Sequence, residues 1–268
     1  MPASFKPIRL PKRSPLVSQV LVIKALFIRE VATRFGEYRL GFFWMLFEPI
    51  LGVVVIGLVI GTLAARTVPE IPYPFFVLNG MVFLRVFTGP MNDGMNAINS
   101  NQGLLVYPTV RPLDPFIARF MFDLITSAFS FILFCMAGMW WGIPLSLGHL
   151  HYVAIALLLT WMSGCGFGLI FGVAAAHFKE VEKIIPVLQR PLLFVSAVMF
   201  PMAALPEHAQ DLLLHNPLVH TIELSRKALF PLYHSGEANF VYPTSFAIIV
   251  LAMGLAMFQN SKDFLSQR

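Results

Sequence analysis

Long apolar runs alternate with short polar segments along most of the chain. A helix that crosses the hydrocarbon core of a bilayer needs about 20 mostly apolar residues. Runs near this length lie at residues 43–64, 75–91, 116–141, 152–175, 187–205 and 241–258. The pattern therefore predicts an all-α integral membrane protein with six transmembrane helices.

The second and fourth runs carry features that indicate contact with other helices. Asn79 and Arg85 make the second run unusually polar, so we expect it to face a protein interior or a cavity and not bare lipid. Gly164, Gly168 and Gly172 in the fourth run share one helical face because they are four residues apart. Small residues at that spacing let two helix backbones approach closely.

The segment before the sixth run departs from the simple pattern. Pro191 and Pro201 interrupt the fifth run, and we expect it to span the bilayer imperfectly. Residues 207–215 and 218–230 then have helical patterns that are too short to cross a bilayer. We interpret these two segments as re-entrant or surface helices.

The first 40 residues differ from the rest of the chain. Ser14 and Pro15 have the form of a helix start. From residue 17 to 38, apolar and polar side chains fall on opposite sides of a helical wheel, which predicts a cytoplasmic amphipathic helix at the membrane interface. We therefore divide the chain into residues 1–40, a basic arm with this helix, and residues 41–268, a six-span transmembrane domain.

Composition and charge support a membrane location. Hydrophobic residues make up 57% of the chain and charged residues only 12%, which excludes an ordinary water-soluble globule. The net charge of +5 could indicate nucleic acid. With both termini cytoplasmic, however, all Lys and Arg residues are cytoplasmic except Arg66, Arg85, Arg226 and Lys227. The positive-inside rule accounts for that distribution without a nucleic-acid partner.

The sequence lacks the residues of an enzyme that works alone. A P-loop needs glycine directly before its lysine, and no lysine here follows a glycine. Any ATP hydrolysis must therefore take place on another subunit. We also expect no carboxylate pair within a span, no metal site and no cofactor bound by this chain. A membrane enzyme acting on lipid-linked sugars remains the alternative from a different class.

Arg85 is the most conspicuous charge, because an arginine in mid-helix costs about 2.5–3.5 kcal/mol on insertion. We expect it either to pair with Glu48 of the first run or to bind an anionic substrate. Trp44 and Phe47 at the start of that run form either an interfacial belt or a surface on which sugar rings stack. Trp44, Phe47, Glu48 and Arg85 are therefore the candidate substrate path.

Three segments resemble one known family. Residues 39–44, RLGFFW, followed by Glu48 and Pro49, are similar to the "LG..W...EP" entry of capsule polysaccharide permeases, the KpsM-like branch of type-2 ABC exporters. Residues 101–112, NQGLLVYPTVRP, resemble the first cytoplasmic coupling region of that family. Asn216 and Pro217 with Glu223 and Arg226 resemble its outer "NP…E..R" stretch.

The resemblance implies a transport subunit of the bacterial inner membrane. The family's permeases are homodimers that work with two cytosolic ATPase subunits, which bind ATP and Mg²⁺, and the wider assembly includes periplasmic and outer-membrane partners. The implied function is export of a lipid-linked acidic capsular polysaccharide. Export of O-antigen, teichoic acid, a drug or a lipid by the same architecture is the alternative within transport.

The resemblance also implies which residues contact the ATPase. The first cytoplasmic loop contains a short apolar stretch and several prolines, the form of a rigid element that docks on a partner. The second loop differs from the family's usual "RD" form. The candidate coupling residues in these two loops are Leu104, Leu105, Val106, Tyr107, Arg111, Glu180 and Glu182.

Overall fold

A computed structural model describes residues 14–36, 71–105, 109–234 and 236–266 of the chain. The helices in these ranges are α1 (Pro15–Gly36), α3 (Tyr73–Met95), α4 (Gln102–Leu105), α5 (Asp114–Trp140), α6 (Leu150–His177), α7 (Val181–Gln189), α8 (Leu192–Val195), α9 (Glu207–Leu214), α10 (Pro217–Leu229) and α11 (Val241–Ser266). Three short 3-10 turns join them: η1 (Asn99–Asn101), η2 (Leu147–His149) and η3 (Met202–Ala204). The described ranges contain no strand, which confirms the all-α prediction.

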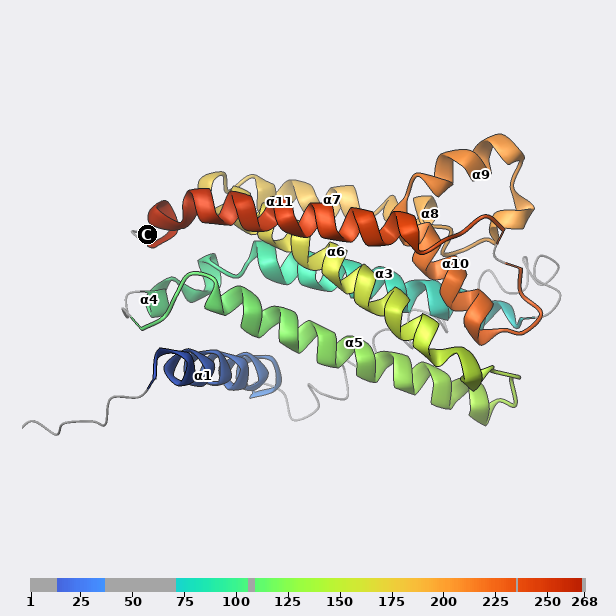
Figure 1. The fold of residues 1–268 in the computed structure, drawn as a ribbon, viewed down its shortest axis with the longest axis horizontal. Helices are drawn as coiled ribbons and strands as arrows, with labels where there is room; N and C mark the ends of the chain where they lie inside the picture. The colour runs from blue at the N-terminus through green and yellow to red at the C-terminus, as the bar shows by residue number, and fades with distance from the viewer. Residues whose placement is uncertain (1–13, 37–70, 106–108, 235, 267–268) are drawn as a thin grey trace, which may run out of the picture.

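Four long helices run side by side along the molecule (Figure 1). They cover Tyr73–Met95, Asp114–Trp140, Leu147–His177 and Val241–Lys262, and each is long and apolar enough to cross a membrane. The second, third, fourth and sixth predicted runs are therefore confirmed as helices of spanning length. The first run, with its predicted span, lies outside the described residues.

The fifth run is not one continuous helix. α7 ends at Gln189, the four-residue α8 follows Pro191, and Ala197 then takes a φ of 51°. Proline cannot donate the backbone hydrogen bond that continues a helix, which explains the break at Pro191. The two short helices expected after this run are present as α9 and α10.

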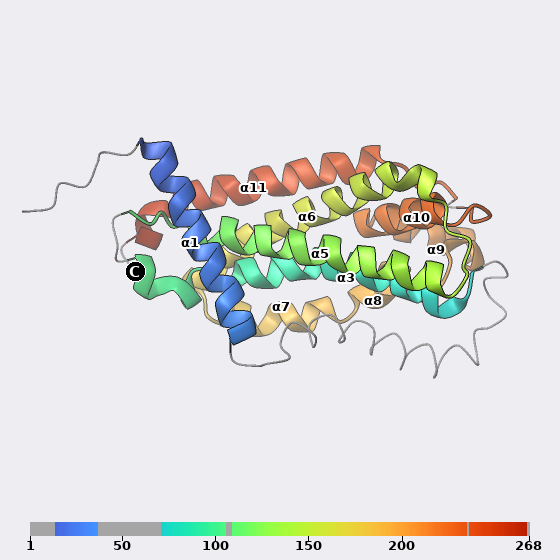
Figure 2. The same ribbon diagram turned by 90° about the horizontal axis from the view of Figure 1, so that it is seen from below.

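The bundle has two distinct ends (Figures 1 and 2). α1 crosses the long helices obliquely at one end, where α4 and the C-terminal part of α11 also lie, and we call this the α1 end. α9 and α10 lie at the opposite end, which we call the α10 end. α1 and the last residues of α11 therefore lie at the same end of the bundle.

α1 begins where the sequence predicts. The backbone N–H of Val17 donates to Oγ of Ser14 at 3.4 Å, so Ser14 caps the helix. Apolar side chains such as Val17 and Val20 are exposed, whereas polar residues on the other side contact the bundle. The interfacial position of this helix and the division of the chain near residue 40 stay predictions.

α6 occupies the centre of the bundle, between α3 and α11. A Cβ atom added at Gly164 would lie 2.4 Å from the carbonyl oxygen of Phe87, and one at Gly168 would lie 2.4 Å from that of Pro90. At Gly172 the added atom would lie 2.6 Å from the carbonyl oxygen of Gly94. The predicted glycine stripe therefore seats α6 directly on the backbone of α3.

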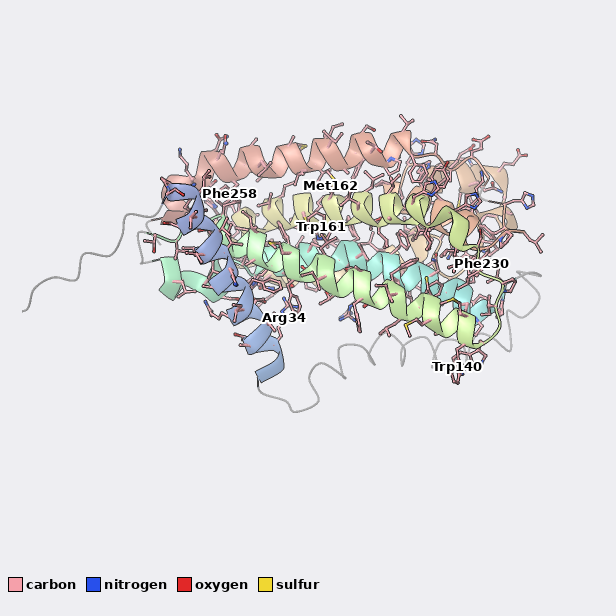
Figure 3. The ribbon with its side chains drawn as sticks, turned by 60° about the horizontal axis from the view of Figure 1, so that its bottom comes forward. Arg34, Trp140, Trp161, Met162, Phe230 and Phe258 are labelled. Carbon is pink, nitrogen blue, oxygen red and sulfur yellow. The ribbon has the colours of Figure 1, made fainter. Side chains whose placement is uncertain are left out.

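Aromatic side chains join α5 to α6 near the middle of the bundle and α5 to α11 near the α1 end (Figure 3). The indole N–H of Trp161 donates to the carbonyl oxygen of Phe120 at 3.0 Å. Phe258 of α11 packs edge-on against Phe116 of α5, with 5.8 Å between ring centroids. These contacts hold the long helices in register around the polar sites at either end.

Candidate functional site

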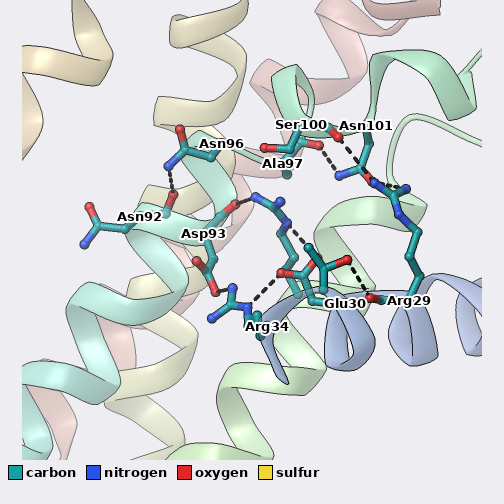
Figure 4. Close-up of polar contacts among 11 residues, drawn as sticks. Arg29, Glu30, Arg34, Asn92, Asp93, Asn96, Ala97, Ser100 and Asn101 are labelled. Carbon is teal, nitrogen blue, oxygen red and sulfur yellow. Dashed lines mark hydrogen bonds and ion pairs between the residues drawn. The ribbon is translucent and has the colours of Figure 1, made fainter. Parts of the chain in front are cut away.

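Four charged side chains from three helices meet where α1 crosses the bundle (Figure 4). Arg34 of α1 pairs with Glu30 of the same helix at 2.8 Å and with Asp93 of α3. Arg119 of α5 lies 3.4 Å from Glu30 and donates to the carbonyl oxygen of Asp93 at 2.9 Å. We call Glu30, Arg34, Asp93 and Arg119 the α1 network; it fixes α1 to α3 and α5.

α1 also contacts the segment between α3 and α5. Arg29 donates to Oδ1 of Asn101 at 2.9 Å and to the carbonyl oxygen of Ser100 at 3.5 Å. Gln19 donates to the carboxylate of Asp114, which also accepts from the backbone N–H of Arg111 at 2.8 Å. These hydrogen bonds join α1 to the segment that connects α3 to α5 and to the start of α5.

The two predicted coupling loops meet at the α1 end. Nδ2 of Asn99 in η1 donates to Oε1 of Glu182 in α7. Asn92 of α3 and Gln189 of α7 exchange two side-chain hydrogen bonds of 3.1 and 2.8 Å. The structure thus brings Glu182 beside the first loop, a contact across more than 80 residues that no local pattern indicates.

The other coupling candidates are spread around this junction. Leu104 in α4 is half-buried, and Arg111 and Glu180 are exposed. Leu105 ends α4, and Val106 and Tyr107 lie outside the described residues. Their contact with an ATPase stays a prediction.

Among the candidate substrate-path residues, Trp44, Phe47 and Glu48 lie outside the described residues, so a pair between Glu48 and Arg85 stays a prediction. Arg85 is exposed on α3 and lines a cavity of about 330 Å³. Asn79, the other polar residue of this run, is fully buried and donates to Oγ of Ser225 at 2.8 Å. The expectation that this helix faces protein or a cavity is therefore confirmed.

The cavity corrects the expectation that no carboxylate pair lies within a span. Asp93 of α3 and Asp123 of α5 both line it, and their carboxyl groups are close enough to interact. α3 continues to Met95, beyond the predicted end of its run, and so includes Asp93. The described residues that line the cavity are Arg34, Val82, Arg85, Val86, Thr88, Gly89, Asn92, Asp93, Phe122, Asp123, Thr126, Ser127 and Ser130.

A buried ion pair holds the α10 end together. Glu223 and Arg226 of α10 are 2.9 Å apart, and both side chains are 0% exposed. Arg226 also donates to the carbonyl oxygens of Ala197 at 2.9 Å and Val198 at 3.0 Å, and its guanidinium carbon lies 3.5 Å from the ring centroid of Phe76. We call this the Glu223–Arg226 clamp; it joins α10 to α3 and to the turn after α8.

The rest of the "NP…E..R" stretch also has a structural role. Oδ1 of Asn216 accepts from the backbone N–H of Leu218 at 3.0 Å, which caps α10, and Pro217 occupies the first helical position. The hydroxyl of Tyr233 donates to Glu223 at 2.8 Å. The sequence analysis placed Arg226 outside the membrane in a re-entrant or surface helix, and the structure shows that its side chain is buried.

His220 is a buried histidine at the α10 end. Its Nδ1 accepts from the backbone N–H of Asn239 at 3.1 Å, and its Nε2 lies 2.8 Å from the carbonyl oxygen of Leu214. This arrangement suits the neutral ring with its proton on Nε2. Burial lowers the pKa of His220 accordingly.

A histidine whose pKa is lower in the folded than in the unfolded chain reduces stability as the pH falls below its ordinary value of about 6.5. We expect the wild-type protein to lose more thermal stability than His220→Gln between about pH 7.5 and 5.5. Melting curves of both proteins measure the difference, and His215→Gln, at an exposed histidine, serves as the control. Equal losses in wild type and His220→Gln would contradict the assignment.

Comparisons with known proteins assign the chain that forms this helical bundle to a class of membrane transporters. The chain belongs to the ABC-2 type transporter family, whose model matches residues 22–230. It is 37% identical over 259 residues to "Polysialic acid transport protein KpsM" of Escherichia coli, with 94% of this chain and 97% of the relative covered.

Two further relatives show how far the similarity extends. "Capsule polysaccharide export inner-membrane protein CtrC" of Neisseria meningitidis serogroup A is 29% identical, over 90% of this chain and 91% of its own length. "O-antigen export system permease protein RfbA" of Myxococcus xanthus is 22% identical, over 88% of this chain and 90% of its own length. The relatives therefore match this chain along nearly their whole length.

Proposed function

We propose that this chain is the transmembrane permease subunit of an ATP-driven exporter that moves a lipid-linked acidic capsular polysaccharide across the bacterial inner membrane. The observation that carries the proposal is the nearly full-length similarity to the Escherichia coli transport protein for polysialic acid. The lower identity to an O-antigen permease makes capsule export the better assignment. In this assignment both termini are cytoplasmic and the α1 end faces the cytoplasm.

Energy has to come from a partner, in keeping with the absence of a P-loop in the sequence. Two copies of the permease bind two cytosolic ATPase subunits, which carry ATP and Mg²⁺, and periplasmic and outer-membrane proteins continue the path. A permease responds to ATP only if an element on its cytoplasmic side makes different contacts in two states of the ATPase. The junction of η1, α4 and α7, joined to α1 by Arg29, is that element.

Identification of the protein that co-purifies with this chain is the simplest test of this proposal. The tagged chain, purified from membranes of its native host in mild detergent, should bring down an ABC ATPase in a one-to-one ratio, measured by quantitative mass spectrometry. Enzymatic turnover of lipid-linked sugars by the chain alone, with no ATPase present, would support the membrane-enzyme alternative instead.

Leu105→Asp should uncouple the permease from its ATPase. The substitution places a charge at the end of α4, where we expect an apolar contact with the partner. Retention of the ATPase in the purification, and export in cells, should both be lost while the permease itself stays folded. Leu212→Asp, at an exposed leucine of α9 at the α10 end, is the matched control. Normal ATPase binding by Leu105→Asp would contradict the assignment.

A further inference from the structure

The cavity between α3 and α5 is built from two facing polar stripes. Arg85, Gly89 and Asn92 line it from α3, and Asp123 and Ser130 line it from α5. Seven residues of helix span about 10 Å, so the stripes are longer than the site of a single ion. A volume of about 330 Å³ also lies within the range of pockets that hold small organic groups.

Thr88, Thr126 and Ser130 present hydroxyl groups to this cavity that can act as acceptors. Thr88 donates its proton to the carbonyl oxygen of Leu84 at 2.9 Å, and Ser130 donates to that of Thr126 at 2.8 Å. Thr126 donates in the same way to the carbonyl oxygen of Asp123 at 3.1 Å. A hydroxyl has one proton and two lone pairs, so only lone pairs remain for a ligand.

Asp123 is the second observation that indicates a ligand. Asp123 is 7% exposed, and its Oδ2 atom is buried without a hydrogen-bond donor among the described residues apart from the neighbouring carboxyl group of Asp93. A buried acceptor without a donor is costly, and most such groups in proteins are satisfied. A Cβ atom added at Gly89 would lie 3.4 Å from Oδ1 of Asp123, so the missing side chain keeps the space before this carboxylate open.

Positive charge lies on the same walls. Arg34 already pairs with Glu30 and Asp93, and it stacks on Phe122 with 4.5 Å from its guanidinium carbon to the ring centroid. Arg85 lines the same cavity, and the N–H groups of a guanidinium suit carboxylate or phosphate oxygens. The cavity therefore combines acceptors for hydroxyl protons with a donor for an anion.

We propose that this cavity binds a group that carries hydroxyls beside an anionic centre. The anionic oxygens lie at Arg85, and the hydroxyls donate to Asp123, Thr126 and Ser130. Two sources have this chemistry. One is an acidic sugar unit of the exported glycan, and with this ligand the inference rests on the proposed function. The other is a membrane phospholipid with a glycerol headgroup, and with this ligand the inference does not depend on the proposed function.

Native mass spectrometry of the permease–ATPase complex distinguishes the two sources. The probes are phosphatidylglycerol, phosphatidic acid, which has the phosphate without the headgroup hydroxyls, and a soluble sialic acid dimer. Either preferential retention of phosphatidylglycerol over phosphatidic acid by about ten-fold, or binding of the dimer, supports the site and names its ligand. Equal retention of the two lipids together with no binding of the dimer overturns it.

The variant Gly89→Val tests whether the probe binds in this cavity. The first carbon added at Gly89 would lie at an ordinary contact distance of 3.4 Å from Oδ1 of Asp123, and the methyl groups of valine take up space in front of this carboxyl group, so we expect the helix to fold and the cavity to narrow. Affinity for the bound probe should fall about ten-fold, whereas Gly148→Val, at a glycine with open space around it, should leave it unchanged. Wild-type affinity in Gly89→Val would overturn the proposal. Normal ATPase retention and surface polysaccharide alongside that result would leave the export function standing.

Discussion

Arg226→Met should destabilise the α10 end of the bundle by about 3–5 kcal/mol, because it removes one partner of a buried ion pair and leaves the carboxylate of Glu223 uncompensated. The same change also removes the donors to the carbonyl oxygens of Ala197 and Val198. α10 would then lose the contacts that Arg226 makes with α3 and with the turn after α8. The measurement is the melting temperature of the purified complex, followed by loss of its monodisperse fraction on heating.

Lys227→Met is the matched control for this prediction, since it removes the neighbouring cation, which is exposed. The double variant Glu223→Gln with Arg226→Met should recover part of the loss, because it leaves no buried charge without a partner. A melting temperature for Arg226→Met equal to that of Lys227→Met would show that the clamp does not support the fold.

Gly168→Leu should abolish the folded permease. The first added carbon would lie 2.4 Å from the carbonyl oxygen of Pro90, which is backbone and cannot move aside without separating α6 from α3. Overpacking a core usually costs about 1–3 kcal/mol, and a clash between two helix backbones belongs at or above the upper limit. The yield of monodisperse permease after membrane extraction should fall to background.

Gly148→Leu provides the comparison, because a Cβ atom added at Gly148 meets nothing within 4 Å. It should be extracted at the wild-type yield. A normal yield for Gly168→Leu would mean that α6 and α3 are not in backbone contact in the membrane, and the arrangement of the bundle would have to be revised.

The features that sequence predicts well here depend on one helix at a time. The runs that became α3, α5, α6 and α11 carry their own signal in length and apolarity. The glycine stripe of α6 shows in a four-residue spacing, although the sequence does not say that α3 is the helix it contacts. Local pattern also located the cap of α1 at Ser14.

The features that sequence missed depend on two or more segments. Asp93 and Asp123 are 30 positions apart and come together only because α3 and α5 pack against each other. The i, i+3 spacing of Glu223 and Arg226 could have indicated a pair, but their burial comes from α3 and the turn after α8. A helical wheel likewise divides α1 into two faces without showing which one meets the bundle.

Surface polysaccharide tests the central claim most directly. In the native host, the coding sequence for this chain is deleted and then restored, and surface glycan and intracellular lipid-linked glycan are both quantified. We predict that deletion removes the polysaccharide from the surface and accumulates its lipid-linked form inside, and that restoration reverses both only when the partner ATPase hydrolyses ATP. Unchanged surface polysaccharide after deletion would contradict the assignment of this chain as its export permease.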